Sequence, residues 1–190
     1  MSATNGIHEN MKEFTIYKKD DEEIKIIDNF FSDNILKEIV DYFKTIDWKC
    51  QCIKDKNTNL YSDSPYWRIE LIENTFFNSY LNAIIEKYFN KNMKLNRLYV
   101  VGQMYGQDSN FHIDDEKPNT YTFCFYINDI IDDNGNFFIR IPDKKTILNI
   151  EPIMNRAVVF PSNYRHKGSG FNRFSDKLRI CIAWKYKILE

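Results

Sequence analysis

The sequence lacks any run of roughly 18 uninterrupted apolar residues, so it predicts no membrane-spanning helix. Its first residues also lack the basic-then-apolar pattern of a secretory signal. No sign of charge is in excess, because 26 lysines and arginines stand against 27 aspartates and glutamates. A protein that binds nucleic acid usually carries a basic excess, which is missing here. We therefore expect a soluble, cytoplasmic protein with no membrane or nucleic-acid partner.

Cysteine is scarce, with four residues in a chain of 190. Cys50 and Cys52 are too close for an ordinary structural disulfide. A lone Cys-x-Cys pair is also a weak zinc signal when no second pair accompanies it. Cys124 and Cys181 lie within apolar strand patterns. The sequence thus predicts free thiols, which agrees with an intracellular protein.

The N-terminal half of the chain predicts two helices. Residues 1–23 are polar and without periodicity, so we expect a flexible tail that holds a solvated His8. Residues 24–31 and 67–72 are expected to be strands. Apolar residues at helical spacing predict a helix from Asp33 to about Thr45, with Ser32 as N-cap.

Two further segments complete this half. The polar segment from Asp47 to Pro65 predicts an exposed loop beside a substrate groove. Asn74 and Thr75 can cap a second amphipathic helix that ends near Asn90.

Helical signals fade after residue 94, and short strands separated by turn residues follow. The expected strands cover residues 95–105, 121–128, 136–141, 146–150, 157–160 and 178–187. Many short strands after a helical half predict two packed antiparallel sheets with helices against one of them. We therefore expect one mainly β domain over residues 24–190, a double-stranded β-helix of the jelly-roll or cupin-like kind.

Three histidines occur in the chain, and two of them suggest a metal site. His112 and Asp114 are two residues apart, so on a strand both side chains point to one face. The intervening strands could bring His166 back beside them. Two neutral imidazoles and one carboxylate form the facial triad of non-haem iron(II) oxygenases. The alternatives are a polar surface turn at His112 and Asp114, and a half-buried His166 that bonds a loop carbonyl.

Arg179 is a candidate anion ligand. Between Leu178 and Trp184 the alternation places Arg179, Cys181 and Ala183 on one strand face, which could line the barrel lumen. A buried guanidinium requires an anion, and a carboxylate could bind it through two hydrogen bonds. A structural salt bridge or an arginine at the strand edge are the alternatives.

Residues from about 24 to 186 resemble the prolyl-4-hydroxylase-like branch of the iron(II)- and 2-oxoglutarate-dependent dioxygenases. The resemblance rests on His112-x-Asp114, on a strand that ends in Phe160-Pro161, on His166 shortly after it, and on the final strand with Arg179. It implies a hydroxylase that uses Fe(II), 2-oxoglutarate and O₂, with ascorbate as a reductant. The metal ligands and catalytic residues would be His112, Asp114 and His166.

The resemblance also suggests how the cosubstrate would be held. Arg179 would bind the distal carboxylate of 2-oxoglutarate, with Tyr126 close by, Cys124 on the same strand face as Tyr126, and Tyr105 closing the pocket. Arg179 follows His166 at a longer spacing than is usual in the family, so residues 168–176 must form an enlarged loop. Arg173 and Lys177 are weaker alternatives to Arg179, because each precedes the apolar alternation.

The substrate is left open by these residues. The resemblance suggests a prolyl or other residue in a peptide or protein, and a free amino acid or small metabolite is the alternative. Asp114 favours hydroxylation, since related halogenases have a small residue at that position. A hypothesis of a different class is a catalytically silent jelly roll that binds a ligand or a partner protein.

Overall fold

The computed structural model describes residues 6–51, 64–129, 134–142 and 144–189. Its main element is an eight-stranded antiparallel sheet with the strand order β1-β2-β9-β6-β11-β5-β4-β3. The strands are β1 (Lys12–Lys19), β2 (Glu22–Asp28), β3 (Lys49–Gln51), β4 (Tyr66–Glu70), β5 (Met93–Gln103), β6 (Thr120–Tyr126), β9 (Arg156–Pro161) and β11 (Arg179–Ile188). A second antiparallel sheet has the order β10-β7-β8, from β7 (Phe137–Arg140), β8 (Ile147–Ile150) and β10 (His166–Gly168).

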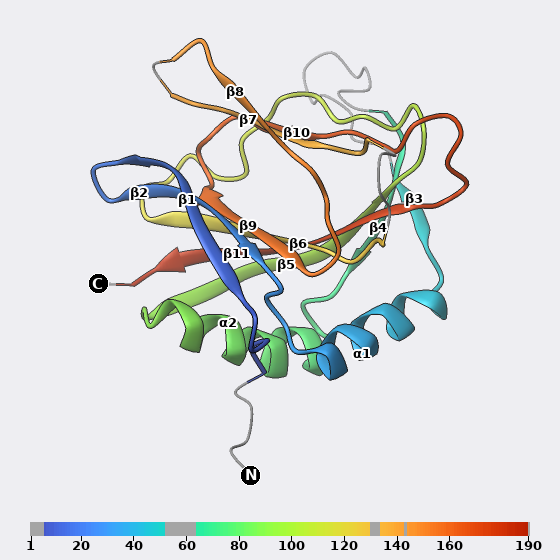
Figure 1. Ribbon diagram of the computed structural model, residues 1–190, viewed down its shortest axis with the longest axis horizontal. Helices are drawn as coiled ribbons and strands as arrows, with labels where there is room; N and C mark the ends of the chain where they lie inside the picture. Colours follow the sequence, from blue (N-terminus) through green and yellow to red (C-terminus); the bar gives the residue numbers. More distant parts are fainter. Residues whose placement is uncertain (1–5, 52–63, 130–133, 143, 190) are drawn as a thin grey trace.

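The two sheets face each other, and the helices cover the outer face of the larger one (Figure 1). This arrangement confirms the predicted mainly β jelly roll with helices packed on one sheet. Alternation along β11 explains the two layers, because successive side chains point to opposite faces. Ile182 and Trp184 face the helices, whereas Cys181 and Ala183 face the smaller sheet.

The helices provide the apolar layer beneath the large sheet. In α1 (Asp33–Lys44), the buried residues Ile35, Ile39 and Phe43 are spaced four residues apart, as the sequence predicts. Ser32 stands at the N-cap, but its hydroxyl makes no capping hydrogen bond. The second helix begins with a π-helical turn (Phe76–Leu81) and continues as α2 (Asn82–Phe89). Among the described residues, no helix is both long and apolar enough to cross a membrane.

Both ends of the second helix agree with the sequence. The Asn74 side-chain oxygen accepts hydrogen bonds from the backbone N–H of Phe76 and Phe77, at 3.1 and 3.4 Å. Asn90 ends the helix with a left-handed backbone at φ 48°, a conformation that asparagine tolerates better than most residues.

The prediction of a flexible tail over residues 1–23 is wrong for its second half. Residues 12–19 form β1, which pairs along its length with β2. Exposed edge strands often carry charged side chains, so β1 lacks the apolar pattern by which a strand is recognised. His8, expected to be solvated without a partner, lies with its Nε2 3.3 Å from an Asp33 carboxylate oxygen. Residues 1–5 lie outside the described residues.

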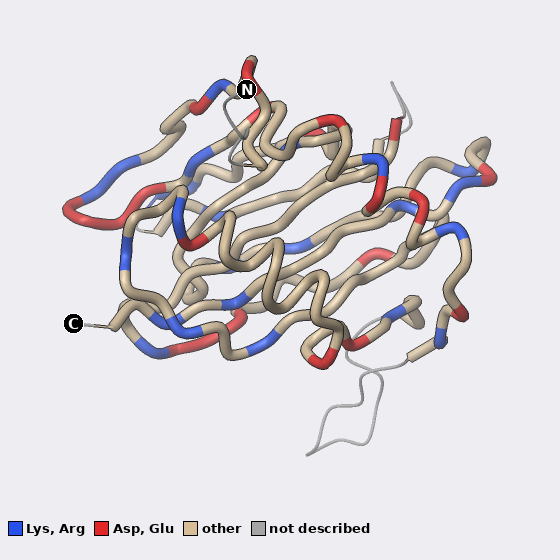
Figure 2. The backbone as a smooth tube through the Cα atoms, turned by 90° about the horizontal axis from the view of Figure 1, so that it is seen from below, with Lys and Arg blue, Asp and Glu red and all other residues tan. Residues whose placement is uncertain are grey.

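Two more short strands were missed. β3 and β10 have three residues each, too few for a period-two pattern to be visible. β3 lies within the segment 47–65 that was predicted as a loop, and residues 52–63 of that segment lie outside the described residues. Basic and acidic residues alternate in short stretches along the described backbone (Figure 2).

Candidate metal centre and adjoining pocket

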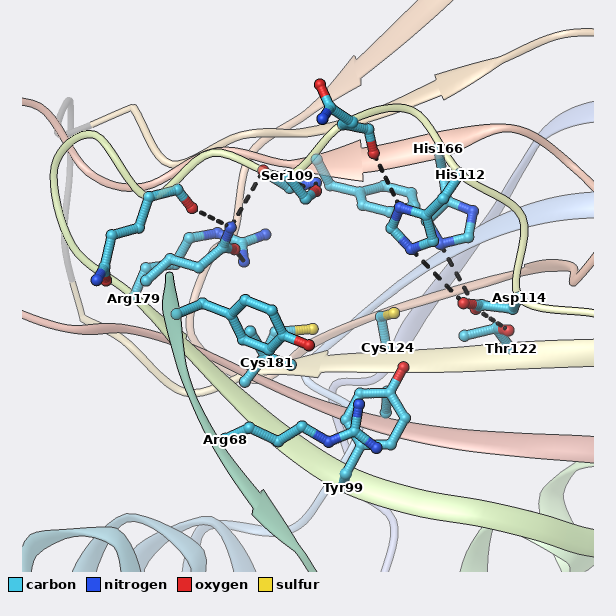
Figure 3. A pocket seen from close by; sticks show the side chains of 18 of the residues that line it. Arg68, Tyr99, Ser109, His112, Asp114, Thr122, Cys124, His166, Arg179 and Cys181 are labelled. Carbon is cyan, nitrogen blue, oxygen red and sulfur yellow. Dashed lines mark hydrogen bonds and ion pairs between the residues drawn. The ribbon is translucent and has the colours of Figure 1, made fainter. Parts of the chain in front are cut away.

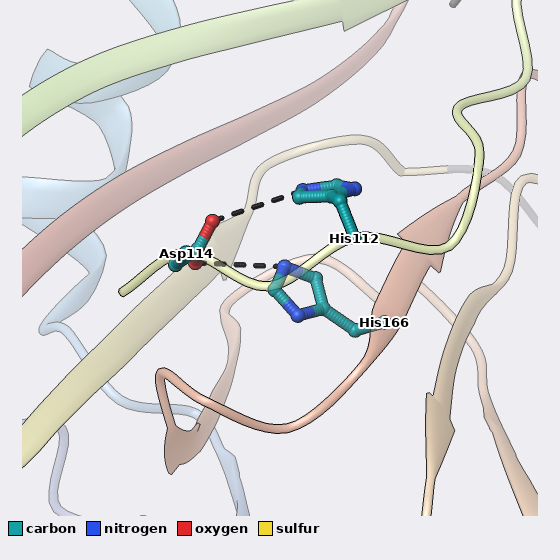
Figure 4. Close-up of side chains that lie close together, drawn as sticks. All are labelled: His112, Asp114 and His166. Carbon is teal, nitrogen blue, oxygen red and sulfur yellow. Dashed lines mark ion pairs between the residues drawn. The ribbon is translucent and has the colours of Figure 1, made fainter. Parts of the chain in front are cut away.

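The structure brings His112, Asp114 and His166 together (Figure 4). His112 and His166 form an isolated antiparallel bridge, in which each backbone N–H donates to the carbonyl of the other at 3.0 and 2.9 Å. This bridge holds two distant parts of the chain in register. The backbone N–H of Asp114 donates to the Ser162 carbonyl at 2.8 Å, which fixes the carboxylate on the same site.

The ligand atoms of the triad converge on one point. Asp114 Oδ1 lies 3.7 Å from His112 Nε2, and Asp114 Oδ2 lies 3.5 Å from His166 Nε2. One ligand atom from each of the three residues lies within 4.8 Å of the others. Two imidazole nitrogens and one carboxylate oxygen on one side leave the other side open, which suits a non-haem iron(II) ion.

Hydrogen bonds set the orientation of both imidazoles. His112 Nδ1 lies 2.9 Å from the Asn110 carbonyl oxygen, and His166 Nδ1 lies 2.8 Å from that of Tyr164. A carbonyl can only accept, so each Nδ1 carries a proton, and in the neutral form of each ring Nε2 is left with a lone pair for a metal ion. This is the tautomer that a metal ligand requires.

The surroundings of the triad shift the pKa values of His112 and Asp114 in the directions that favour metal binding. Desolvation by the surrounding protein lowers the pKa of His112, and the neighbouring His166 lowers it further, which favours the neutral ring. Burial alone would raise the pKa of Asp114, but hydrogen bonding and charge from His166 and the charge of Lys185 hold it well below its ordinary value. Asp114 is therefore an anion in a side chain that is only 3% exposed.

Arg179 lies at the other side of the same pocket (Figure 3). It is 2% exposed. Its Nε donates to the Gly135 carbonyl, and one terminal nitrogen donates to Gln103 Oε1 at 2.9 Å. No described carboxylate forms an ion pair with this guanidinium. A buried charge without a counter-ion is costly, which fits the binding of an anionic ligand there.

Tyr126 adds a second unsatisfied group beside Arg179. The Arg179 guanidinium carbon lies 5.2 Å from the centre of the Tyr126 ring. The Tyr126 hydroxyl is buried and has no hydrogen-bond partner. Burial raises the pKa of Tyr126 well above its ordinary value, so the hydroxyl keeps its proton and can donate. Arg179 lines the pocket and suits a carboxylate, whereas Tyr126 is fully buried and is not part of the pocket lining.

Of the other two candidates from the sequence, Cys124 lines the pocket and Tyr105 does not. Cys124 lines the pocket, as does Cys181, and Figure 3 shows both between Arg179 and Asp114. Tyr105 is not brought to the pocket, because its side chain is 66% exposed. β5 ends at Gln103, and the turn that follows carries Tyr105 outward.

The alternatives to Arg179 do not reach the pocket either. Arg173 and Lys177 are exposed on the segment after β10 and are absent from the pocket lining. That segment, predicted as an enlarged loop, packs against the protein through Phe171, which is 2% exposed.

Sequence reasoning missed several residues of the pocket. Lys185 donates a hydrogen bond from its ammonium to Asp114 Oδ1, and Thr122 donates to Asp114 Oδ2 at 2.7 Å. Burial lowers the pKa of Lys185, and the charge of Asp114 opposes this effect. Continuing the alternation of Arg179, Cys181 and Ala183 by one step would have placed Lys185 on the lumen face.

The pocket has a volume of about 420 Å³ and lies between the two sheets. Its lining combines the triad, Arg179, side chains of β4, β5, β6 and β11, and residues of the segment that precedes His112. Figure 3 shows Arg68 and Tyr99 on the side formed by the large sheet. The pocket is therefore continuous from the triad to Arg179.

Comparisons with known proteins give the same architecture. No family model matches the sequence, and no curated protein matches it. A prolyl hydroxylase from Trichoplax adhaerens, solved with a peptide fragment of hypoxia-inducible factor, superposes with a TM-score of 0.65 at 16% identity over 86% of this chain and 83% of its own. A 2-oxoglutarate and Fe(II) oxygenase from Burkholderia pseudomallei gives 0.63 at 12% identity over 83% and 80%.

A third similar structure is the 2-oxoglutarate-dependent epimerase SnoN from nogalamycin biosynthesis, with a TM-score of 0.62 at 10% identity over 86% of this chain and 76% of its own. Two of these similar structures are named for different reactions, a prolyl hydroxylase and an epimerase. The chain thus has the jelly-roll fold of the iron(II)- and 2-oxoglutarate-dependent oxygenases.

Proposed function

We propose that the protein is an iron(II)- and 2-oxoglutarate-dependent oxygenase that hydroxylates an unactivated C–H bond. The observation that carries this proposal is a single pocket with two kinds of site. One side holds two correctly oriented imidazoles and a buried carboxylate, and the other holds the buried guanidinium of Arg179. Iron(II) with 2-oxoglutarate supplies the oxidation when bound, converting 2-oxoglutarate, O₂ and R–H into succinate, CO₂ and R–OH.

The residues of the chain position the reactants. His112, Asp114 and His166 would hold the metal, and Arg179 with Tyr126 would hold the distal carboxylate of 2-oxoglutarate. Gln103 orients the guanidinium of Arg179 through its hydrogen bond. Phe137 and Phe160 pack against the His166 ring at centroid distances of 5.5 and 4.7 Å, which keeps water from one side of the site.

A residue in a peptide or protein is the proposed substrate. Supporting this choice, one similar structure holds a peptide fragment, and the pocket beside the triad opens to solvent at His112, whose side chain is 44% exposed. The alternative of a small acid or amino acid is compatible with the volume of the pocket.

Succinate release from 2-oxoglutarate under air tests the function, with and without iron(II). We expect release that depends on iron and oxygen and that is lost in His112→Ala, Asp114→Ala and His166→Ala. His8→Ala is the matched control, because this histidine pairs with Asp33 outside the pocket and should leave release unchanged. Metal binding without any succinate release would instead support a catalytically silent jelly roll.

A further inference from the structure

A cluster of cations surrounds the ring of Tyr99, a residue of β5 that lines the pocket. The Arg68 guanidinium carbon lies 3.9 Å from the ring centre, the Lys185 ammonium nitrogen lies 4.8 Å from it, and the Arg97 guanidinium carbon lies 5.3 Å from it. All three cations line the pocket that also holds the triad. Tyr99 itself is 8% exposed, so the cluster has a buried centre.

The strand register makes this cluster costly. Lys185 of β11 and Arg97 of β5 are direct partners across the antiparallel pair. Like charges directly opposite one another destabilise a sheet. The register shifts immediately after this pair, so the irregularity lies where the two cations meet. Such irregularities are frequent beside active sites, where they redirect a side chain.

Counter-ions do not balance the cluster. Arg68 pairs with Glu70, and Lys185 pairs with Asp114. Arg97 forms no ion pair within the described part of the chain. Asp114 is also the carboxylate of the triad, and a bound metal dication would compete with the Lys185 ammonium for it. Arg97 and Lys185 are then left facing the pocket with an excess of positive charge.

The proposed binding mode of 2-oxoglutarate already uses both of its charged ends, the distal carboxylate at Arg179 and the keto acid at the metal. The keto acid would lie close to Lys185, because the Lys185 ammonium pairs with the triad carboxylate of Asp114. Arg97, on the exposed side of the Tyr99 cluster, is then left for an anion from a second molecule.

We propose that Arg97 and Lys185, with Arg68 beside them, form the site for a carboxylate carried by the substrate. The carboxylate belongs either to an acidic residue of a peptide or to a free organic acid, and both would present the same group to the same cations. Because it names a substrate, this site rests on the oxygenase function proposed above. Arg97 is exposed at the mouth and Lys185 is buried beside Asp114, so the carboxylate would enter along Arg97.

Binding to protein loaded with Zn(II) and saturating 2-oxoglutarate tests the site without turnover. Calorimetry would compare two sets of probes. The first is a panel of N-acetyl amino acids and the corresponding N-acetyl amino amides. The second is a panel of short peptides, blocked at both ends, that contain aspartate or glutamate, with matched peptides that contain asparagine or glutamine. The first set detects a free acid and the second an acidic residue.

We expect the acids of one set to bind at least tenfold more tightly than their neutral partners. Arg97→Gln should remove that preference, Arg97→Lys should retain most of it, and Lys94→Gln on the same strand should leave it unchanged. Equal binding of acids and amides, no binding of either set, or an acid preference that survives Arg97→Gln would overturn the proposal. Binding of 2-oxoglutarate and succinate release, measured on the same protein, report separately on the oxygenase function.

Discussion

Arg179 allows the sharpest test of the proposed 2-oxoglutarate site. The guanidinium is 2% exposed and makes hydrogen bonds to Gly135 and Gln103, so its position is fixed before a ligand arrives. Each hydrogen bond between charged groups contributes about 1.5–3 kcal/mol. Loss of two such bonds, partly offset by water that enters after truncation, should cost about 3 kcal/mol. At 1.4 kcal/mol per factor of ten, Arg179→Ala should raise the Kd for 2-oxoglutarate by about a hundredfold.

Two further substitutions resolve this contribution. Arg179→Lys keeps the charge but loses the planar pair of donors, so we expect about a tenfold rise in Kd. Tyr126→Phe removes only a neutral hydroxyl, and the rise should be about fivefold, from about 1 kcal/mol. Because the Tyr126 hydroxyl has no partner in the free protein, the phenylalanine variant should fold with undiminished stability.

Anaerobic calorimetric titration of 2-oxoglutarate into Mn(II)-loaded protein measures these constants without turnover. Arg173→Gln is the matched control, because Arg173 is exposed and lies outside the pocket. An Arg179→Ala protein that binds 2-oxoglutarate as tightly as the unchanged protein would refute the assignment. A large effect of Arg173→Gln would move the anchor to the segment that follows β10.

Three predictions concern stability, each measured by urea denaturation of the metal-free protein. Asp114→Ala should lower the free energy of unfolding by about 3–5 kcal/mol, because it leaves the buried Lys185 ammonium unpaired. Adding Lys185→Met should recover most of that loss. A double variant that is no more stable than Asp114→Ala would contradict the ion pair. Asn155→Ala should cost about 3 kcal/mol, because the Asn155 amide accepts from the N–H of Phe31 at 2.9 Å and donates to its carbonyl at 2.7 Å, and a cost below about 1 kcal/mol would show that water replaces both bonds. Gly170→Ala should cost at least about 1–3 kcal/mol, since its Cβ would lie 1.9 Å from a backbone carbonyl oxygen, and unchanged stability would mean that this loop shifts freely.

The parts of the fold that follow a periodic pattern could be predicted from sequence. The α1 helix and the central strands combine regular apolar spacing with clear turn residues, because they bury one or both faces. β1 could not be recognised in this way, since an exposed edge strand is stabilised by backbone pairing and charged side chains. β10 was hidden by its length, although it carries His166.

The candidate site was also predicted in part: the sequence indicated the three triad residues and Arg179, but it missed Lys185 and misplaced Tyr105. Histidine and arginine stand out in a sequence because each is rarely placed on an apolar strand without a reason. Lys185 was overlooked because a lysine near the end of a strand usually faces solvent, although the alternation of Arg179, Cys181 and Ala183 extends to it. Tyr105 was misplaced for a related reason. The sequence cannot tell that β5 ends at Gln103, which leaves Gln103 rather than Tyr105 beside Arg179.

β11 determines the dimensions of the pocket as well as its two charged ends. Arg179 and Lys185 stand on the same face of this strand, and Cys181 and Ala183 lie between them. Long cations at both ends and small residues in the middle leave a cavity above the sheet in which two separate anions can bind. Because β11 is paired on both sides, with β5 and β6, the separation of the two ends is rigid. A strand of this kind can fix one anion at Arg179 and a second at Lys185 without movement of the backbone.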